Sequence, residues 1–165
     1  MKKAKIANSM GANNGIDENH FEERTFLLIE NHEHDVLLMK EAFLRAAIPN
    51  PLRVLSGGDK AIAYLKGVSP FRDRASHPLP SVLLLDLYLP GKDGFAVIDW
   101  VRHHPTLRRL MIIGLTNSSR GEDADRAYDL GINYYLTKPG PFTDLVNSMS
   151  RLYLWLRLCH FPRVV

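Results

Sequence analysis

The chain has 165 residues, of which 45% are hydrophobic and 24% charged, which is enough for one globular domain with its own core. The net charge is +3, and residues 151–165 hold three arginines and no acidic residue, so the excess lies in a basic tail and argues against a nucleic-acid-binding protein. A single cysteine excludes an intramolecular disulfide framework, and no apolar run is long enough to span a membrane, so we expect a cytoplasmic protein.

Residues 1–24 are rich in Asn, Gly, Lys and Glu and show no apolar period, which predicts a flexible leader. After them, short apolar runs alternate with segments of helical periodicity. The runs predict strands at residues 25–30, 52–56, 81–86, 110–116 and 133–137. The segments between and after them predict helices at residues 35–47, 58–66, 95–103, 119–130 and 143–158. We therefore expect one domain over residues 25–158 and a short tail over residues 159–165.

The predicted strands are too uniformly apolar to have a face in water. Such strands, each followed by a helix, predict a doubly wound parallel α/β sheet with helices on both faces. In sheets of this class the functional crevice lies at the carboxyl ends of the strands. The polar residues that end the predicted strands are Glu30, Asn31, Asp86, Thr116 and Lys138.

These residue types suit phosphoryl chemistry. The carboxylate of Asp86 can accept a phosphoryl group as a covalent nucleophile, and Mg²⁺ held by oxygen ligands can neutralise the charge that develops. The Lys138 ammonium and the Thr116 hydroxyl can contact phosphoryl oxygens. Taken singly, each residue is more simply interpreted as a turn, a cap or a solvated charge. Together they predict one site.

Three segments resemble the signatures of bacterial two-component response-regulator receiver domains: LLLDLYLPGKDG at 83–94, LT at 115–116 and YLTKP at 135–139. The match extends over about residues 25–158. The resemblance implies a flavodoxin-like (βα)5 fold with strand order 2-1-3-4-5. It also implies that a partner histidine kinase phosphorylates an aspartate of the chain, with no turnover of an external substrate.

The resemblance also implies the roles of individual residues. Asp86 takes the position of the phosphoacceptor. The implied Mg²⁺ ligands are Glu30, Asn31, Asp86 and the backbone carbonyl of Tyr88. Thr116 and Lys138 are implied to be the pair that senses the phosphoryl group, and Tyr135 is implied to be the aromatic switch residue.

Asn31 departs from the family pattern, which has Asp here as the principal metal ligand of the first strand. Asn keeps a carbonyl oxygen but removes one negative charge, which weakens the attraction for Mg²⁺. The retained Glu30, Asp86, Thr116 and Lys138 favour a working site with altered metal affinity. The alternative is a phosphate-independent pseudo-receiver that acts as an interaction module. A small phosphatase or flavodoxin-like enzyme is disfavoured, because no Gly-rich or flavin-cradling loop follows the first strand.

The segment after Asn31 reads HEHD. We interpret His32 and His34 as solvated loop residues, because two exposed loop histidines seldom form a metal site on their own. We expect Asp35 to cap the helix that follows.

The last predicted helix is apolar on nearly every side over residues 152–158, more than one sheet face can bury. Leu145, Val146, Met149, Leu152 and Trp155 form its expected core-facing set. The excess predicts a homodimer through the last helix. The expected interface residues are Leu152, Trp155 and Leu156. The alternative is that residues 160–165 fold back and cover this surface.

The helix predicted over residues 119–130 has few apolar residues and should be loosely held, which suits a switch that changes how a downstream protein binds. The long last helix, the Pro-containing tail and the extended segment over residues 68–80 also resemble small regulators that partner bacterial phytochrome kinases. That resemblance implies a sensor histidine kinase of the phytochrome type as the partner.

Overall fold

The computed structural model describes residues 21–162, so most of the predicted leader lies outside the described residues. Each of the five strands is followed by one helix. The strands are β1 (Phe26–Ile29), β2 (Leu52–Leu55), β3 (Val82–Asp86), β4 (Met111–Thr116) and β5 (Tyr134–Thr137). The helices are α1 (Glu33–Arg45), α2 (Gly58–Lys66), α3 (Gly94–His103), α4 (Gly121–Asp129) and α5 (Phe142–Leu156).

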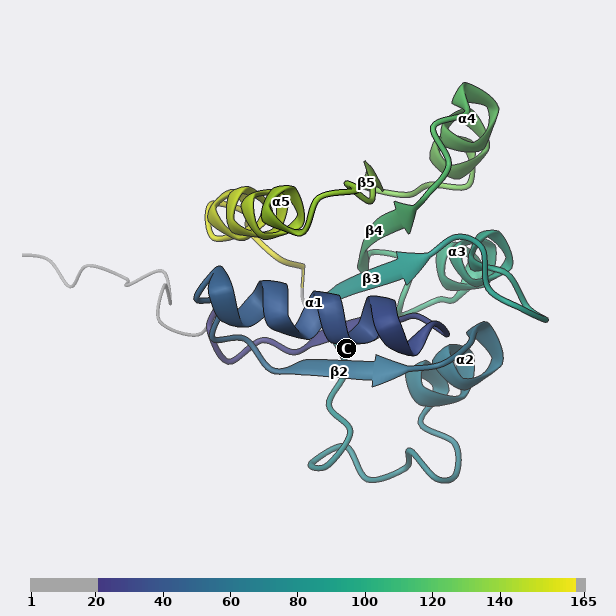
Figure 1. Cartoon of the computed structure of the whole chain (residues 1–165). Coiled ribbons are helices and arrows are strands. Elements are labelled where there is room, and N and C mark those ends of the chain that lie inside the picture. Colours follow the sequence, from purple (N-terminus) through teal and green to yellow (C-terminus); the bar gives the residue numbers. More distant parts are fainter. Residues whose placement is uncertain (1–20, 163–165) are drawn as a thin grey trace, which may run out of the picture.

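The strands form one sheet in the order β2-β1-β3-β4-β5, and every neighbouring pair is parallel. Figure 1 shows this sheet with its helices. The flavodoxin-like fold and strand order implied by the receiver resemblance are therefore confirmed. The chain moves outward in one direction from β1 to β2 and in the other from β3 to β5. The switch point thus lies between β1 and β3, where ligands bind in this class of sheet.

Helices cover both faces of the sheet. Alternate residues of a strand point to opposite faces, so Phe26 and Leu28 pack with α1 and α5, whereas Leu27 and Ile29 pack with α2, α3 and Ala127 of α4. All residues of β1 and β3 are buried. Burial on both faces explains why these strands read as continuous apolar runs.

Helix α5 is rotated relative to the expectation from the sequence. Its buried residues are Leu145, Met149, Tyr153 and Leu156. Leu156 is fully buried among the side chains of α1 and α5, so its assignment to a dimer interface is wrong. Trp155, placed in the expected core-facing set, is 45% exposed. The spacing of four, four and three residues between the buried positions keeps them on one helical face, which leaves Trp155 outside.

Residues at both ends of the described chain pack against each other. The ring of Phe21 lies 6.2 Å from that of Phe26, 5.7 Å from that of Tyr153 and 5.6 Å from that of Phe161. Residues 160–162 therefore fold back toward the domain, but they leave Trp155 exposed. Residues 163–165 lie outside the described part.

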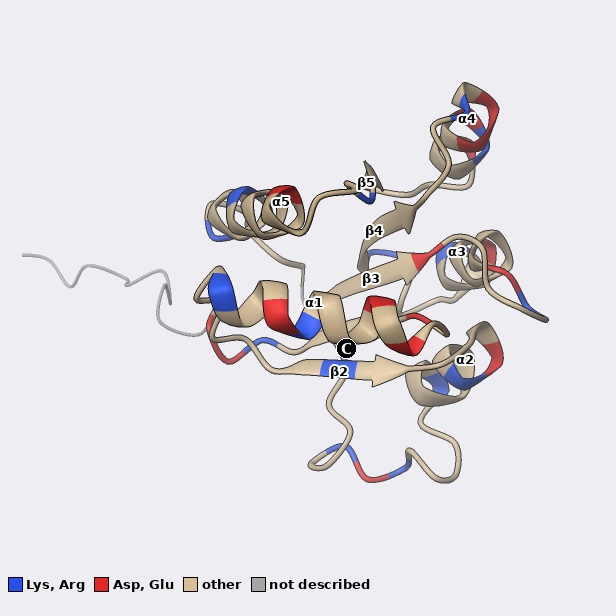
Figure 2. Ribbon diagram, in the orientation of Figure 1, with Lys and Arg blue, Asp and Glu red and all other residues tan. Residues whose placement is uncertain are grey.

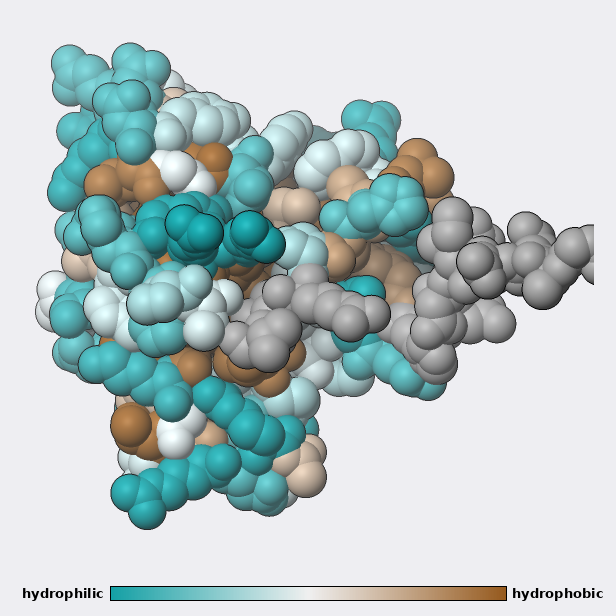
Figure 3. All heavy atoms as spheres, turned by 180° about the vertical axis from the view of Figure 1, so that it is seen from behind, coloured by the Kyte–Doolittle hydropathy of each residue, from teal (hydrophilic) through white to brown (hydrophobic). Residues whose placement is uncertain are grey.

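The surface seen from behind is mostly hydrophilic, with small separate hydrophobic patches (Figure 3). None of the helices in the described range combines the length and apolar character needed to cross a bilayer.

Candidate functional site

The strand register brings the predicted residues to one edge of the sheet. In-register pairing of β1 with β3 places Glu30 beside Asp86, directly after the last paired residues. The backbone N–H of Lys138, just after β5, donates to the carbonyl of Thr116 over 2.7 Å. Figure 2 shows the acidic start of α1 and the acidic end of β3 at the same edge.

Lys138 holds three carboxylates together at this edge. Its Nζ atom donates to Glu30 Oε2 at 2.5 Å, to Asp86 Oδ2 at 2.8 Å and to Asp35 Oδ2 at 2.9 Å. The side chains of Lys138, Glu30 and Asp86 are at most 11% exposed. We call these four residues the carboxylate–lysine cluster. By strand alternation Glu30, Asp86 and Lys138 all point to the α1 and α5 side of the sheet, which is why α1 can contribute the fourth member.

Asp35 is the member that the sequence analysis missed. It was expected to cap the first helix, but α1 begins at Glu33, its N-cap is His32, and no side chain forms a cap hydrogen bond there. Asp35 instead lies in the first turn of α1 and turns its carboxylate toward Lys138. Its position in the first turn of the helix that follows the Glu30-Asn31 strand end was the available signal.

Burial and charge act in opposite directions on this cluster. Burial would raise the pKa of Glu30, but hydrogen bonds from Lys138 and the backbone of His32 outweigh it and hold that pKa below its usual value. At Asp86 burial prevails over the hydrogen bonds from Lys138 and the backbone of Tyr88, so the pKa of Asp86 is raised. Burial opposes the charge of Lys138 too, but its bonds to the three carboxylates raise its pKa well above normal.

The oxygen atoms around the cluster fit a small hard cation. Ligand atoms of Glu30, His32, Asp35 and Asp86 all lie within 4.8 Å of one another. Asn31 Oδ1 is buried and has no hydrogen-bond partner among residues 21–162. Carboxylate and amide oxygens are the ligands that Mg²⁺ prefers, so the residues present fit the ion implied by the family. The buried amide oxygen of Asn31 has no other bond within the described residues to give up if it coordinates such an ion.

His32 and His34 lie at the margin of the cluster. The ring Nδ1 of His32 is 3.3 Å from Glu30 Oε1, although the side chain is 65% exposed. His34 lines a cavity of about 280 Å³ that also borders Asp35 and Lys138. Both histidines are exposed to solvent, as expected, but His34 lies within α1 and not in a loop.

Thr116 and Tyr135 contact the loop between β4 and α4 instead of the carboxylates. The Thr116 hydroxyl accepts from the backbone N–H of Ser118 at 2.9 Å, and the Tyr135 hydroxyl donates to the Ser118 carbonyl at 3.1 Å. Arg120, which the sequence analysis did not single out, donates from Nη2 to the hydroxyl of Tyr88 at 2.8 Å. This loop is therefore bonded to Thr116, to the predicted switch residue Tyr135 and to the loop after Asp86.

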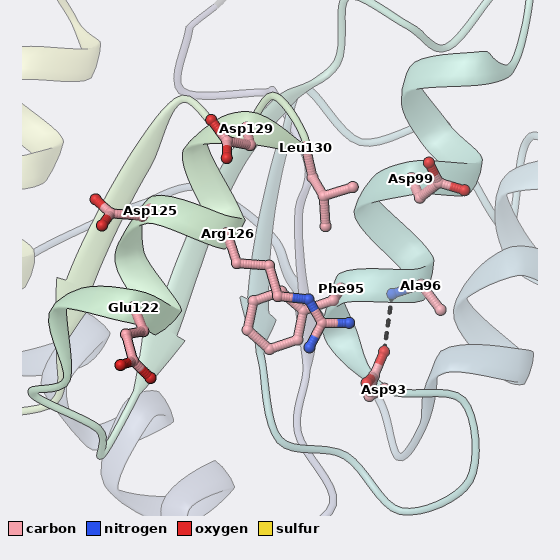
Figure 4. Close-up of a pocket in the computed structure, with 9 residues that line it drawn as sticks. All are labelled: Asp93, Phe95, Ala96, Asp99, Glu122, Asp125, Arg126, Asp129 and Leu130. Atoms are coloured by element: carbon pink, nitrogen blue, oxygen red, sulfur yellow. Dashed lines mark hydrogen bonds between the residues drawn. The ribbon is translucent and has the colours of Figure 1, made fainter.

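A larger groove lies between α3 and α4, beside the cluster and not in it. Its volume is about 780 Å³, and the guanidinium of Arg126 lies 4.1 Å from the centre of the Phe95 ring inside it (Figure 4). Asp93 accepts from the backbone N–H of Ala96 at 2.8 Å and so caps α3. The other acidic residues that line the groove are Asp99, Glu122, Asp125 and Asp129. No member of the carboxylate–lysine cluster lines it.

A model of the response regulator receiver domain matches residues 26–150, most of the chain. This chain belongs to the response regulator receiver family. The receiver is 31% identical to the response regulator Rcp1 of Synechocystis over 140 residues, which cover 84% of this chain and 93% of Rcp1.

Solved structures agree with this assignment. The response regulator RPA3017 in red light signaling of R. palustris has a TM-score of 0.81 and 35% identity, covering 85% of this receiver and 99% of that chain. The phosphorylated cyanobacterial phytochrome response regulator RcpA has a TM-score of 0.77 and 30% identity over 86% of this receiver and 99% of RcpA. The Mn²⁺-bound form of Rcp1 has a TM-score of 0.76 and 31% identity over 85% and 99% of the two chains.

Replacing Asp86 with asparagine is expected to stabilise the receiver at neutral pH. A carboxyl whose pKa is raised by folding costs stability once it ionises, so the cost is absent below its ordinary pKa of 3.8 and grows as pH rises through the folded value. We expect the melting temperature of Asp86→Asn to exceed that of the parent by about 3 °C at neutral pH, equivalent to about 1 kcal/mol. The difference should vanish near about pH 3. A lower melting temperature at neutral pH would contradict this account.

Proposed function

We propose that the chain accepts a phosphoryl group on Asp86 from a histidine kinase and signals by changing the protein-binding surface formed by α4, β5 and α5. The observation that carries the proposal is the Lys138 ammonium within hydrogen-bonding distance of the Asp86 and Glu30 carboxylates. This arrangement supports the proposal, because a carboxylate able to act as a nucleophile lies beside a fixed cation at the switch point of the sheet.

The geometry supports a direct displacement at phosphorus. A carboxylate oxygen of Asp86 forms the new bond to phosphorus, the bond from phosphorus to the kinase imidazole breaks, and the imidazole leaves with its electron pair. Mg²⁺ bound beside the carboxylates would supply charge neutralisation for the phosphoryl oxygens. Lys138 can then turn from the carboxylates to the phosphoryl group, and the backbone N–H of Tyr88 already holds Asp86 Oδ1 at 2.8 Å.

Helix α4, which we expect to move on phosphorylation, has few buried contacts that hold it in place. Ala127 is the buried residue of α4, and Tyr128 is 50% exposed. When Thr116 turns to a phosphoryl group, it gives up the hydrogen bond from Ser118, whose carbonyl also holds the Tyr135 hydroxyl. Phosphorylation can thereby shift α4 and Tyr135 together, because the contacts of both differ between the two states.

We further propose that the partner is a sensor kinase of the phytochrome type. The similarity to RPA3017, RcpA and Rcp1 extends over 84–86% of this chain and almost all of each of those chains. The same proposal includes the metal ligands and the residues that respond to the phosphoryl group. The Mg²⁺ ligands are Glu30, Asn31, Asp86 and the Tyr88 carbonyl, the sensing pair is Thr116 and Lys138, and the switch residue is Tyr135.

We also propose that the receiver dimerises through the exposed part of α5. Leu154, Trp155 and Leu158 are 57%, 45% and 83% exposed, and the Trp155 ring lies 6.3 Å from that of the exposed Tyr134. We expect Trp155→Asp to lower the dimer affinity by about tenfold or more, because it places a charge in an apolar interface. Light scattering over a concentration series measures this. Val68→Asp, an equally exposed position in the α2–β3 loop, is the control, and equal behaviour of both variants would contradict the proposal.

Trifluoroberyllate, which mimics a phosphoryl group on a carboxylate, tests phosphoryl acceptance without a kinase. We expect Mg²⁺-dependent binding to the parent and none to Asp86→Asn, with a change in the fluorescence of Trp155 or Trp100 as the readout. Failure of the parent to bind would support the pseudo-receiver alternative.

A further inference from the structure

We propose that Asp35 supplies the negative charge that is missing at position 31 and completes the metal site from α1. This inference rests on the proposed function, since it concerns the same site. It assigns to a helix side chain the task that the family gives to a strand-end carboxylate.

The charges of the cluster support this exchange. Glu30, Asp35 and Asp86 carry three negative charges around one ammonium, with Asn31 neutral. A receiver with a carboxylate at position 31 and none at position 35 would hold the same net charge. The site therefore keeps its negative charge despite Asn31, because Asp35 supplies a carboxylate from the first turn of α1.

The geometry places this charge where a cation would need it. A ligand atom of Asp35 lies within 4.8 Å of those of Glu30 and Asp86. The Asp35 side chain is 28% exposed, so a hydrated ion can reach it from solvent. The buried Asn31 Oδ1, without a partner in the described chain, is a further neutral oxygen on the residue that follows Glu30.

Lys138 is itself a cation, and it lies among the three carboxylates of the cluster. Its single ammonium is shared by three carboxylates, so no one of them has a dedicated positive partner. A divalent ion can take over part of this compensation and free Lys138 for the phosphoryl group. Asp35 thus acts on the ion, either as a direct ligand or through a bound water.

A second possibility is that Asp35 only positions Lys138. The two roles differ in one respect that can be measured. A residue that only positions Lys138 has no effect on the ion once Lys138 is methionine, whereas a carboxylate that donates charge to the ion still strengthens Mn²⁺ binding in that background.

The test is Mn²⁺ binding to the unphosphorylated protein, measured by paramagnetic resonance of the free ion. The variants are Asp35→Asn, Asn31→Asp and the double variant, with Glu33→Gln as the control because Glu33 is an exposed carboxylate in the same helical turn. Asp35→Asn is also compared with its parent in a Lys138→Met background, where an unchanged Mn²⁺ affinity would show that Asp35 only positions Lys138. We expect Asp35→Asn to weaken Mn²⁺ binding by about tenfold to hundredfold, the range typical of residues that support a metal site. Glu33→Gln should change it by less than about twofold. The double variant should return to within about threefold of the parent, because the charge is restored.

Several results would overturn the proposal: no Mn²⁺ binding to the parent, unchanged affinity in Asp35→Asn, an equal loss in Glu33→Gln, or no recovery in the double variant. Thermal melting of each variant checks that the isosteric changes leave the fold intact. Phosphoryl uptake from acetyl phosphate is measured in parallel. If the parent takes up no phosphoryl group but the Mn²⁺ affinities of the variants rank as expected, the proposed function fails and the role of Asp35 stands.

Discussion

Replacing Lys138 with methionine is expected to lower the free energy of unfolding by about 3–5 kcal/mol at neutral pH without Mg²⁺, the usual cost of removing one partner of a buried ion pair. The change leaves Glu30, Asp35 and Asp86 close together without their common cation. Because the fold raises the pKa of Lys138, its stabilisation is present throughout the range below its ordinary pKa of 10.5 and is lost only in strong alkali.

Mg²⁺ should restore much of the stability of Lys138→Met, because a divalent cation can replace the ammonium among the carboxylates. Mild acid should also reduce the deficit, since protonation removes the repulsion. Urea denaturation with and without Mg²⁺ measures both effects. Lys92→Met is the matched control, because Lys92 is 41% exposed and lies 3.8 Å from an exposed Asp59. It should change stability by less than about 0.5 kcal/mol. Equal losses in the two variants would contradict the account.

Gly94→Ala is expected to damage the site through the backbone. A Cβ atom at Gly94 would lie 2.4 Å from the backbone oxygen of Asp86 and 2.6 Å from the Cα atom of Leu87. Neither atom can move aside like a flexible side chain, so the end of β3 has to shift together with the phosphoacceptor. We expect a loss of about 3 kcal/mol in the free energy of unfolding. Phosphoryl uptake should slow by at least about tenfold, because misplaced reacting groups react far more slowly.

The control for this prediction is Gly121→Ala at the start of α4. A Cβ atom at Gly121 meets nothing within 4 Å, and alanine favours the helix. The variant should match the parent or gain up to about 0.5 kcal/mol, with unchanged phosphoryl uptake. The measurements are urea denaturation and the rate of labelling by acetyl phosphate. Normal labelling of Gly94→Ala would show that the loop after Asp86 does not depend on this close contact.

The fold could be predicted because β1 and β3 are buried on both faces and therefore stand out as apolar runs. The candidate site followed because parallel strands end at one edge, so Glu30, Asp86 and Lys138 had to converge. Asp35 could not be predicted in the same way. Its contact with Lys138 depends on the orientation in which α1 packs on the sheet. The hydrophobic periodicity of the sequence does not predict that orientation.

The prediction that Leu156 lies in a dimer interface was wrong for a different reason. The last turns of α5 are apolar on nearly every side, so no polar face indicates which residues point inward. The hydrogen bond between Arg120 and Tyr88 joins two loops, and the two residues are 32 positions apart in the sequence. It depends on the conformation of both loops, which no local sequence pattern predicts. Sequence reasoning was thus most informative where strand ends fix the geometry.

The most direct test of the central claim is the intact mass of the protein after incubation with acetyl phosphate and Mg²⁺. The parent, Asn31→Asp and Asp86→Asn are compared under the same conditions. We predict one added phosphoryl group on the parent and on Asn31→Asp, and none on Asp86→Asn. An adduct on Asn31→Asp with none on the parent would contradict the account, because it would mean that Asn31 disables the site and that Asp35 does not compensate.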